Sequence, residues 1–235
     1  MHILTHEEGD VRYLHYGLFE EENDRLLTAQ QRSTELLISR LPPSNCSILE
    51  VGIGLGTTMA FLVALGNYDV EGITPDEHQI AMVRERYPEM PVHHAAFETF
   101  DPGRTYDVIV FQESSQYIDS EALFARAAAL TPRVIVLDEL ASKPLDEEGA
   151  LHSRKGFLEA AARHGFRVVE ELDLSAKAAP TMDYFTDRIP AYRNRLIADL
   201  GITNEQVDHL IANGVKYRER YTDGTYGYWL LRFEK

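Results

Sequence analysis

The first 176 residues alternate between two patterns of apolar and polar positions. Short apolar runs indicate buried strands, whereas the segments between them repeat their apolar residues at the spacing of a helix. We expect strands at residues 47–51, 69–73, 92–95, 106–111, 133–137 and 166–172. Strands and helices that alternate with short links predict a parallel, doubly wound α/β sheet with helices on both faces.

The helices between these strands have recognisable ends. We expect them at residues 23–40, 57–65, 75–86, 120–130 and 153–164. Pro42 ends the first helix, Gly66 is a typical stop for the second, and Pro75 suits the first turn of the third.

The regular alternation ends near Ser175. Residues 181–221 have a helical, tyrosine-rich pattern with a capping box that starts at Thr203, and residues 225–233 form a last strand. We therefore predict a seven-stranded, mostly parallel α/β sheet with an N-terminal helix and a helical insertion before the final strand. The expected division is a segment that covers the site (1–45), a core (46–176), a helical cap (177–224) and the returning strand (225–235).

Composition narrows the class of protein. At 235 residues with 44% hydrophobic content, the chain suits one sizeable soluble domain. No apolar run approaches the roughly 20 residues that span a bilayer, and the acidic N-terminus lacks a signal-peptide pattern. Cys46 is the single cysteine, so no intramolecular disulfide can form. These features predict a cytoplasmic protein.

Charge narrows the class of partner. The net charge is −15, and nearly all of it lies in residues 1–176. An acidic body repels phosphate backbones, which argues against a nucleic acid, and no basic amphipathic helix favours a membrane surface. We expect a small-molecule partner, and the last strand would permit a homodimer.

A glycine-rich turn follows the first strand, in the order Glu50-Val51-Gly52-Ile53-Gly54-Leu55-Gly56. Glycines let the backbone turn tightly and approach a ligand closely, and the following helix start leaves N–H groups free for a polar group. Thr57 breaks the dinucleotide pattern G-x-G-x-x-G, which disfavours a nicotinamide-dependent oxidoreductase.

With its preceding acid, this stretch resembles motif I of the class I S-adenosylmethionine-dependent methyltransferases. The resemblance implies S-adenosylmethionine as cofactor and S-adenosylhomocysteine as product. It implies that Gly52, Gly54 and Gly56 form the cofactor loop and that Glu50 lies near the methionine amino group.

The end of the second strand resembles a smaller subgroup, which contains the cyclopropane fatty acid synthases. Residues 72–79 are similar to its Gly-(Ile/Val)-Thr-Leu-Ser-x-x-Gln segment, which implies that Thr74 and Gln79 hold the ribose end of the cofactor. After the third strand, Ala96 replaces the Asp that many members place against the adenine. We expect Phe97 near that ring.

Residues 112–117 resemble the Glu-Ser-x-Glu-His segment of tocopherol, sterol and small-molecule methyltransferases. Gln112 is expected at the cofactor, and Glu113 and Ser114 match the pattern. Gln116 and Tyr117 replace the second Glu and the His, which disfavours cyclopropanation of lipids.

Near the N-terminus, His15-Tyr16-Gly17 resembles a His-Tyr-Gly segment of the same subgroup. The resemblance implies that the Tyr16 ring lies against the methionine arm, with Tyr13 as a second candidate, and an aromatic face suits a sulfonium. The alternative is that these rings only pin the terminus to the core.

Methyl transfer by SN2 displacement mainly requires alignment, and a base is needed only where the acceptor must lose a proton. His15 and Glu113 are the candidate bases, and Tyr117 could orient the acceptor. His93 and His94 point to opposite faces of a strand, so we expect no metal site.

The cap should bind the acceptor through its many tyrosines, and Arg188, Arg193 and Arg195 could hold a carboxylate or phosphate. The leading hypothesis is a small-molecule methyltransferase from a biosynthetic pathway. A cofactor-binding protein of the same fold without turnover remains an alternative, as does the oxidoreductase.

Overall fold

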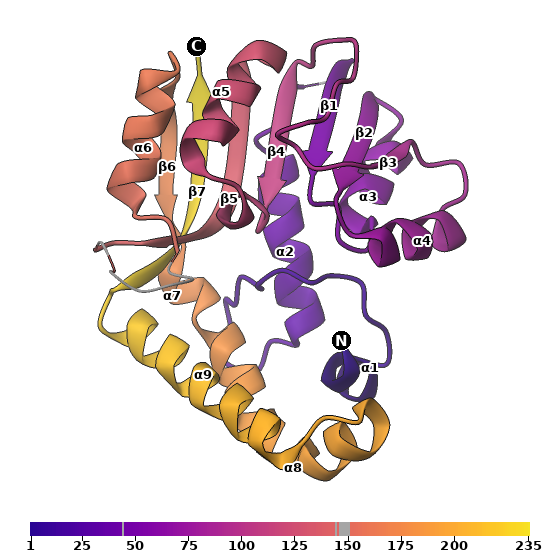
Figure 1. Cartoon of the computed structure of the whole chain (residues 1–235), viewed down its shortest axis with the longest axis vertical. Coiled ribbons are helices and arrows are strands. Elements are labelled where there is room, and N and C mark those ends of the chain that lie inside the picture. The colour runs from indigo at the N-terminus through magenta and orange to yellow at the C-terminus, as the bar shows by residue number, and fades with distance from the viewer. Residues whose placement is uncertain (44, 144, 146–150) are drawn as a thin grey trace.

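The central feature of the computed structural model is a seven-stranded sheet in the order β3-β2-β1-β4-β5-β7-β6 (Figure 1). The structure describes residues 1–43, 45–143, 145 and 151–235. The strands are β1 (Cys46–Val51), β2 (Tyr68–Thr74), β3 (Val92–His94), β4 (Val108–Gln112), β5 (Arg133–Ala141), β6 (Arg167–Asp173) and β7 (Tyr226–Glu234). Only β7 runs antiparallel to its neighbours, so the predicted mostly parallel, doubly wound sheet is confirmed.

Two helical layers cover the sheet, as the apolar strands predict. The helices are α2 (Leu26–Ile38), α3 (Thr57–Leu65), α4 (Glu77–Arg86), α5 (Ser120–Leu130) and α6 (Arg154–Arg163). Helices α2, α3 and α4 pack in one apolar cluster with Ile48, whereas α5 and α6 pack in another with Leu49. Adjacent residues of β1 therefore face different layers, and the strand is buried on both sides.

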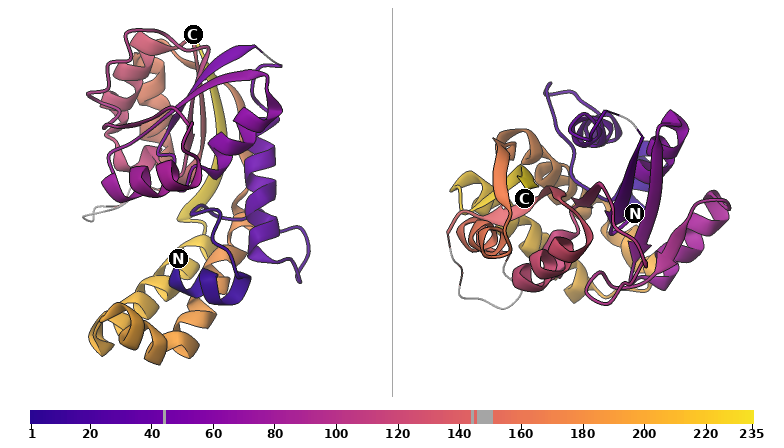
Figure 2. Two further views of the ribbon diagram at one scale, coloured as in Figure 1. Left: turned by 90° about the vertical axis from the view of Figure 1, so that its right-hand side faces the viewer. Right: turned by 90° about the horizontal axis from the view of Figure 1, so that it is seen from above.

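The helical insertion stands beyond the carboxyl ends of the parallel strands (Figures 1 and 2). After the short α7 (Ser175–Ala178), it consists of the paired helices α8 (Pro180–Leu200) and α9 (Asn204–Thr222). The N-terminal helix α1 (His2–Glu8) packs on α8, where Ile3 joins an apolar cluster with Leu196 and Val207. The N-terminus and the insertion thus lie together at the edge of the sheet where the strands end.

Several element boundaries differ by a few residues from those expected, and two of the differences have a clear physical cause. Strand β5 runs to Ala141 because it pairs along its whole length with β7, a contact between segments far apart in sequence. Helix α4 begins at Glu77 rather than Pro75, because the Asp76 side chain accepts hydrogen bonds from the backbone N–H groups of His78 and Gln79. The division into four segments stays a prediction. Among the described residues, no helix combines the length and apolar character needed to cross a bilayer.

The capping box of α9 can be tested directly. The Thr203 hydroxyl accepts from Gln206 N (3.2 Å), and the Gln206 side chain accepts from Thr203 N (2.7 Å). We expect Thr203→Ala to lower the free energy of unfolding by about 1 kcal/mol in urea denaturation, because it removes one partner of the helix start. Thr222→Ala, the same change at the other end of α9, should stay within about 0.5 kcal/mol of the parent. Equal losses in both variants would contradict a specific role for the cap.

Candidate functional site

A cavity of about 370 Å³ lies at the carboxyl ends of β1, β2 and β4. Its walls come from the glycine turn after β1, residues 73–76 with Gln79, residues 95–98, residues 112–114 and 116–118, and the N-terminal segment 12–15. Parallel α/β sheets bind their ligands at this edge. The predicted site residues that line the cavity are Tyr13, His15, Glu50, Gly52, Gly54, Thr74, Gln79, Phe97, Gln112, Glu113 and Tyr117.

Two positions of the glycine turn that lines the cavity need glycine, each for a different reason. A Cβ on Gly52 would overlap the Ser114 side chain, so this position needs glycine for the close approach of β1 and β4. Gly54 has a φ of +51°, and a Cβ there would meet only Leu14, at 3.7 Å. Gly54 therefore provides both the left-handed turn and the open space above it.

Two predicted residues lie outside the cavity wall. Gly56 is the N-cap residue just before α3, and a Cβ there would meet the Val83 side chain of α4 at 3.0 Å, so it allows close packing beside the turn. The Tyr16 ring stacks on Tyr228 with centroids 5.6 Å apart, and its hydroxyl contacts the sulfur of Met182 on α8. Tyr16 thus joins the N-terminal segment to the cap behind the cavity.

Glu50 is a buried carboxyl at the end of β1. Burial raises its pKa from 4.5 to about 8, and its Oε2 atom has no hydrogen-bond partner among the described residues. An orphaned carboxylate in a cavity wall is costly unless a ligand donates to it. Glu50 therefore suits a positively charged donor such as the amino group of the expected cofactor.

Thr74 and Gln79 meet at the next part of the wall. The Thr74 hydroxyl donates to Gln79 Oε1 over 2.9 Å, which leaves the two amide hydrogens of Gln79 available. This pair joins the end of β2 to the first turn of α4. Its free donors suit the oxygens of a ribose, as the resemblance implies.

The opposite wall is apolar. Phe97 is buried and packs edge-on against Phe111, with ring centroids 5.3 Å apart. Ala96 offers no polar side chain, although the exposed Glu98 also lines the cavity. An adenine could lie here on apolar contacts, and Glu98 is an acceptor that the sequence did not single out.

His15 is poorly placed to act as the predicted base. Its Nδ1 lies 2.9 Å from the Tyr16 carbonyl oxygen, and its Nε2 lies 3.1 Å from the Thr34 hydroxyl. Burial lowers the pKa of the imidazole to about 4, so the ring is neutral near pH 7. Both ring nitrogens are already engaged, and His15 therefore holds the segment in place. The adjacent Tyr13 is buried beside it in the wall.

A second polar contact lies in the cavity wall, between Gln112 and Thr58. The side-chain oxygen of Gln112 accepts from the Thr58 hydroxyl over 3.1 Å, and its amide lies 3.5 Å from the Ser33 hydroxyl. Gln112 thus connects β4 with α2 and α3 and holds this part of the wall in place.

Glu113 has the most unusual conformation in the wall. Its φ is +54°, in the left-handed region that residues other than glycine rarely occupy. One carboxylate oxygen accepts from Tyr16 N (2.5 Å) and from the Tyr228 hydroxyl (2.7 Å). Burial and the nearby Glu139 raise the pKa of Glu113 well above its ordinary value. The fold holds a basic carboxylate at the cavity.

The sequence missed two further acids, Asp138 and Glu139, because they lie in the unexpected extension of β5. Asp138 accepts from the Ser115 hydroxyl and backbone and so fixes the loop after β4. Glu139 accepts from the Tyr221 hydroxyl of α9 over 2.8 Å. Burial is the main cause that raises the pKa of Asp138 to about 6 and that of Glu139 to about 7.

Tyr117 and the cap arginines do not surround a common acceptor site within the cavity. Tyr117 is 81% exposed, so it stands at the rim. The three cap arginines are already engaged: Arg188 pairs with Glu7, Arg193 pairs with Asp208, and Arg195 lies against His6. They connect α1, α8 and α9 with one another and do not line the cavity.

His93 and His94 turn to separate partners, Glu71 and the Pro75 carbonyl.

A family model described as a methyltransferase domain matches residues 48–132, which span the glycine turn and the wall up to Tyr117. An O-methyltransferase from Pyrenophora dematioidea is 26% identical over 198 residues, which cover 72% of this chain and 73% of that relative.

Solved structures resemble the whole chain. A protein assigned as a sarcosine dimethylglycine methyltransferase, from Galdieria sulphuraria, matches with a TM-score of 0.84, 17% identity and coverage of 100% of this chain and 97% of that chain. A cyclopropane synthase from Mycobacterium tuberculosis matches with a TM-score of 0.81, 20% identity and coverage of 95% and 90%. These likenesses confirm the predicted fold, and none of these matches supports a nicotinamide-dependent enzyme.

Gly54 offers a test of where the cofactor binds. We expect Gly54→Leu to lower the affinity for S-adenosylhomocysteine at least about a hundredfold, about 2.7 kcal/mol, because the new side chain would occupy the cavity. Gly66→Leu is the matched control, since Gly66 has a φ of +71° at the far end of α3 with open space around it. Calorimetric titration measures both, and unchanged affinity in a folded Gly54→Leu variant would refute this placement.

Glu50 offers a test of pH dependence. Because its folded-state pKa lies above 4.5, the unfolded chain loses this proton first, and stability falls as pH rises from about 4.5 to about 8. We expect Glu50→Gln to raise the free energy of unfolding of the ligand-free protein at pH 7 by up to about 3 kcal/mol, with no gain below pH 4.5.

The same variant should bind S-adenosylhomocysteine more weakly, because the partner of the amino group has lost its charge. Glu85→Gln, at an exposed position of α4, is the control and should change neither quantity. A Glu50→Gln protein that is less stable than the parent at pH 7 and binds the ligand equally well would contradict both roles.

Proposed function

We infer that this chain is an S-adenosylmethionine-dependent methyltransferase, and we propose that it methylates an O–H or N–H group of a small-molecule acceptor with Glu113 as proton acceptor. The observation that carries the proposal is the buried Glu113 carboxylate, held in a left-handed backbone conformation at the cavity wall. Strained residues that the surroundings hold in place are concentrated at functional sites.

The residues of the cavity fit the cofactor. Glu50 has an unpartnered oxygen for the amino group, Gln79 has free donors for the ribose, and Gly54 leaves the space between them open. When bound, S-adenosylmethionine supplies an activated methyl group on a sulfonium. The chain's own contribution is to align the acceptor with that methyl group and to exclude water.

Glu113 suits the proton step. An acceptor that starts as a hydroxyl or an ammonium must lose a proton before or during transfer, and a carboxylate with a raised pKa is a stronger base than an exposed one. Tyr16 N–H and the Tyr228 hydroxyl bind the same Glu113 oxygen, Oε1, so they orient the carboxylate.

The acceptor would enter between Tyr117 and the cap. Tyr117 at the rim can turn over a bound acceptor, and the rings of Tyr16, Tyr221 and Tyr228 form an electron-rich region behind Glu113. The O-methyltransferase relative supports a hydroxyl acceptor, whereas the Galdieria protein, by its assigned substrate, supports an amine. A biosynthetic role, a cytoplasmic location and a homodimer stay predictions.

The proposal is tested with Glu113→Gln. We expect S-adenosylhomocysteine binding to be retained and methyl transfer to fall by about 10²–10⁴-fold, the usual contribution of a positioned base. The assay follows labelled methyl from S-adenosylmethionine into pooled phenols, carboxylic acids and amines. Glu77→Gln, an exposed change outside the cavity wall, should leave transfer unchanged.

The pH profile gives a second, independent measurement. Glu113 works as a base only when ionised, so kcat/KM should rise with pH through a pKa above 4.5, and Glu113→Gln should lose that limb. Equal rates and equal pH profiles in the parent and the variant would remove Glu113 from the mechanism while leaving cofactor binding intact.

A further inference from the structure

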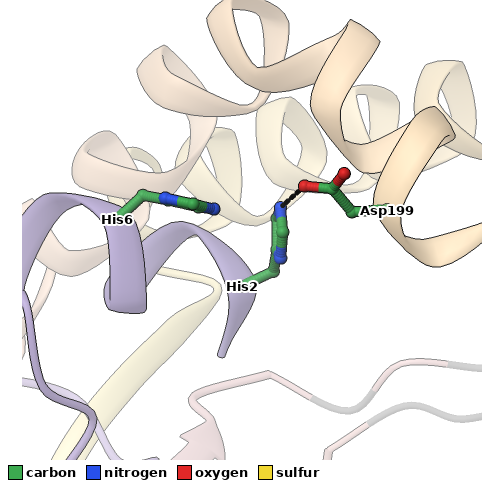
Figure 3. Close-up of side chains that lie close together, drawn as sticks. All are labelled: His2, His6 and Asp199. Atoms are coloured by element: carbon green, nitrogen blue, oxygen red, sulfur yellow. Dashed lines mark ion pairs between the residues drawn. The ribbon is translucent and has the colours of Figure 1, made fainter.

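Three metal-ligating side chains meet where the N-terminal helix crosses the cap. His2 and His6 are four residues apart on α1, so their rings lie on one face of the helix, and Asp199 reaches them from the end of α8 (Figure 3). One ligand atom from each residue lies within 4.8 Å of the other two. His2 Nε2 is 3.2 Å from Asp199 Oδ2, and the His6 ring is directed toward both groups (Figure 3).

The polar atoms of this cluster are incompletely satisfied. His2 Nε2 is buried and makes no hydrogen bond in the described part of the chain, although the Asp199 carboxylate is near. An imidazole nitrogen that is removed from water without a hydrogen bond costs free energy, which the Asp199 carboxylate 3.2 Å away offsets in part, and a metal ion at this point would satisfy the nitrogen fully. This observation separates the cluster from an ordinary group of surface acids.

We propose that His2, His6 and Asp199 bind one divalent transition-metal ion, for which Zn²⁺ is the best fit. Two imidazoles and one carboxylate are ligands that Zn²⁺ accepts, with water as the fourth. The wider separations, up to 4.8 Å, would shorten on binding, because two ligand atoms that each lie about 2 Å from a tetrahedral Zn²⁺ are about 3.3 Å apart, whereas His2 Nε2 and Asp199 Oδ2 already have this spacing. His6 and Asp199 are exposed side chains, so this adjustment needs no change in the core.

One neighbour opposes the metal. Arg195 Nη1 lies 3.1 Å from His6 Nδ1, so its guanidinium occupies the hydrogen-bonding position on that ring. A ligating His6 that binds through Nε2 carries its proton on Nδ1, and the positive charge of Arg195 must then turn away. Arg195 is exposed and can do so. Removal of this arginine should therefore strengthen metal binding.

The site would fasten the N-terminal segment to the cap. Helix α1 is docked on α8 by Ile3, and after Gly9 the chain passes directly to residues 12–15 of the cavity wall. A metal bound across α1 and α8 would restrain the N-terminal end of this segment. Metal occupancy is thus expected to slow proteolysis of residues 9–25, which include residues 12–15 of the cavity wall.

The test uses the full chain without an added tag and Zn²⁺ alone, titrated by calorimetry, with Co²⁺ absorption as the report of coordination. We expect one equivalent to bind. His2→Ala and Asp199→Asn should each weaken binding more than about tenfold, and Arg195→Gln should tighten it. His209→Ala, an exposed histidine on α9 outside the cluster, should bind as the parent does.

Asp199→Asn keeps the proposal testable if His2→Ala perturbs α1, because Asp199 is an exposed residue at the end of α8. Three results would overturn the proposal: no stoichiometric Zn²⁺ binding, binding that survives both ligand substitutions, or equal weakening by His209→Ala. Because the readout is metal binding, it is independent of methyl transfer.

Discussion

Buried carboxyl groups at the carboxyl ends of the strands are the constraint on which this site depends. Glu50, Glu113 and Glu139 end or follow three neighbouring strands, and burial is the first cause of the raised pKa of each. Within the described part of the chain, no ion pair joins any of them to a basic side chain. Such an interior costs free energy when the groups ionise, and it favours a ligand that brings positive charge.

A sulfonium cofactor with an amino group is a ligand of that kind. The unpartnered Glu50 oxygen and the oriented Glu113 carboxylate both belong to residues that line the cavity, at the ends of the neighbouring strands β1 and β4. Their arrangement is prepared before the ligand arrives, because hydroxyl and amide donors fix Glu113 from behind. Because of this preorganisation, the free energy needed to orient the carboxylates is spent when the protein folds and not during the reaction.

The sequence was sufficient to predict contacts between residues of one strand–turn–helix unit. The glycine turn, the Thr74–Gln79 pair and the capping box at Thr203 all join residues that are close in the chain, so local patterns reveal them. The pairing of Tyr228 with Glu113 joins positions more than a hundred residues apart. Similarly, Glu139 lies in β5 because pairing with β7 extends this strand to Ala141. No local sequence pattern predicts how far β5 extends.

Contacts between residues far apart in sequence also explain why the predicted roles of His15 as a base and of the cap arginines as acceptor ligands were wrong. A histidine beside the cofactor segment has the right chemistry for a base, but its two nitrogens are occupied by Tyr16 and Thr34, and only the fold brings Thr34 there. Likewise, the cap arginines meet partners on α1 and α9 because both of these helices pack on α8. The residue types indicated which roles His15 and the cap arginines could have. Their contacts with residues far away in the sequence determine which roles they have in the structure.

The N-terminal segment connects these features mechanically. Tyr16 donates its backbone N–H to Glu113, stacks its ring on Tyr228 and touches Met182 of α8, while Gly17 N donates to Thr181 in the same helix. A displacement of the cap would therefore pull on the carboxylate that we assign to proton transfer. Since the segment also lines the cavity at residues 12–15, the position of the cap, the shape of the cavity wall and the alignment of Glu113 depend on one another.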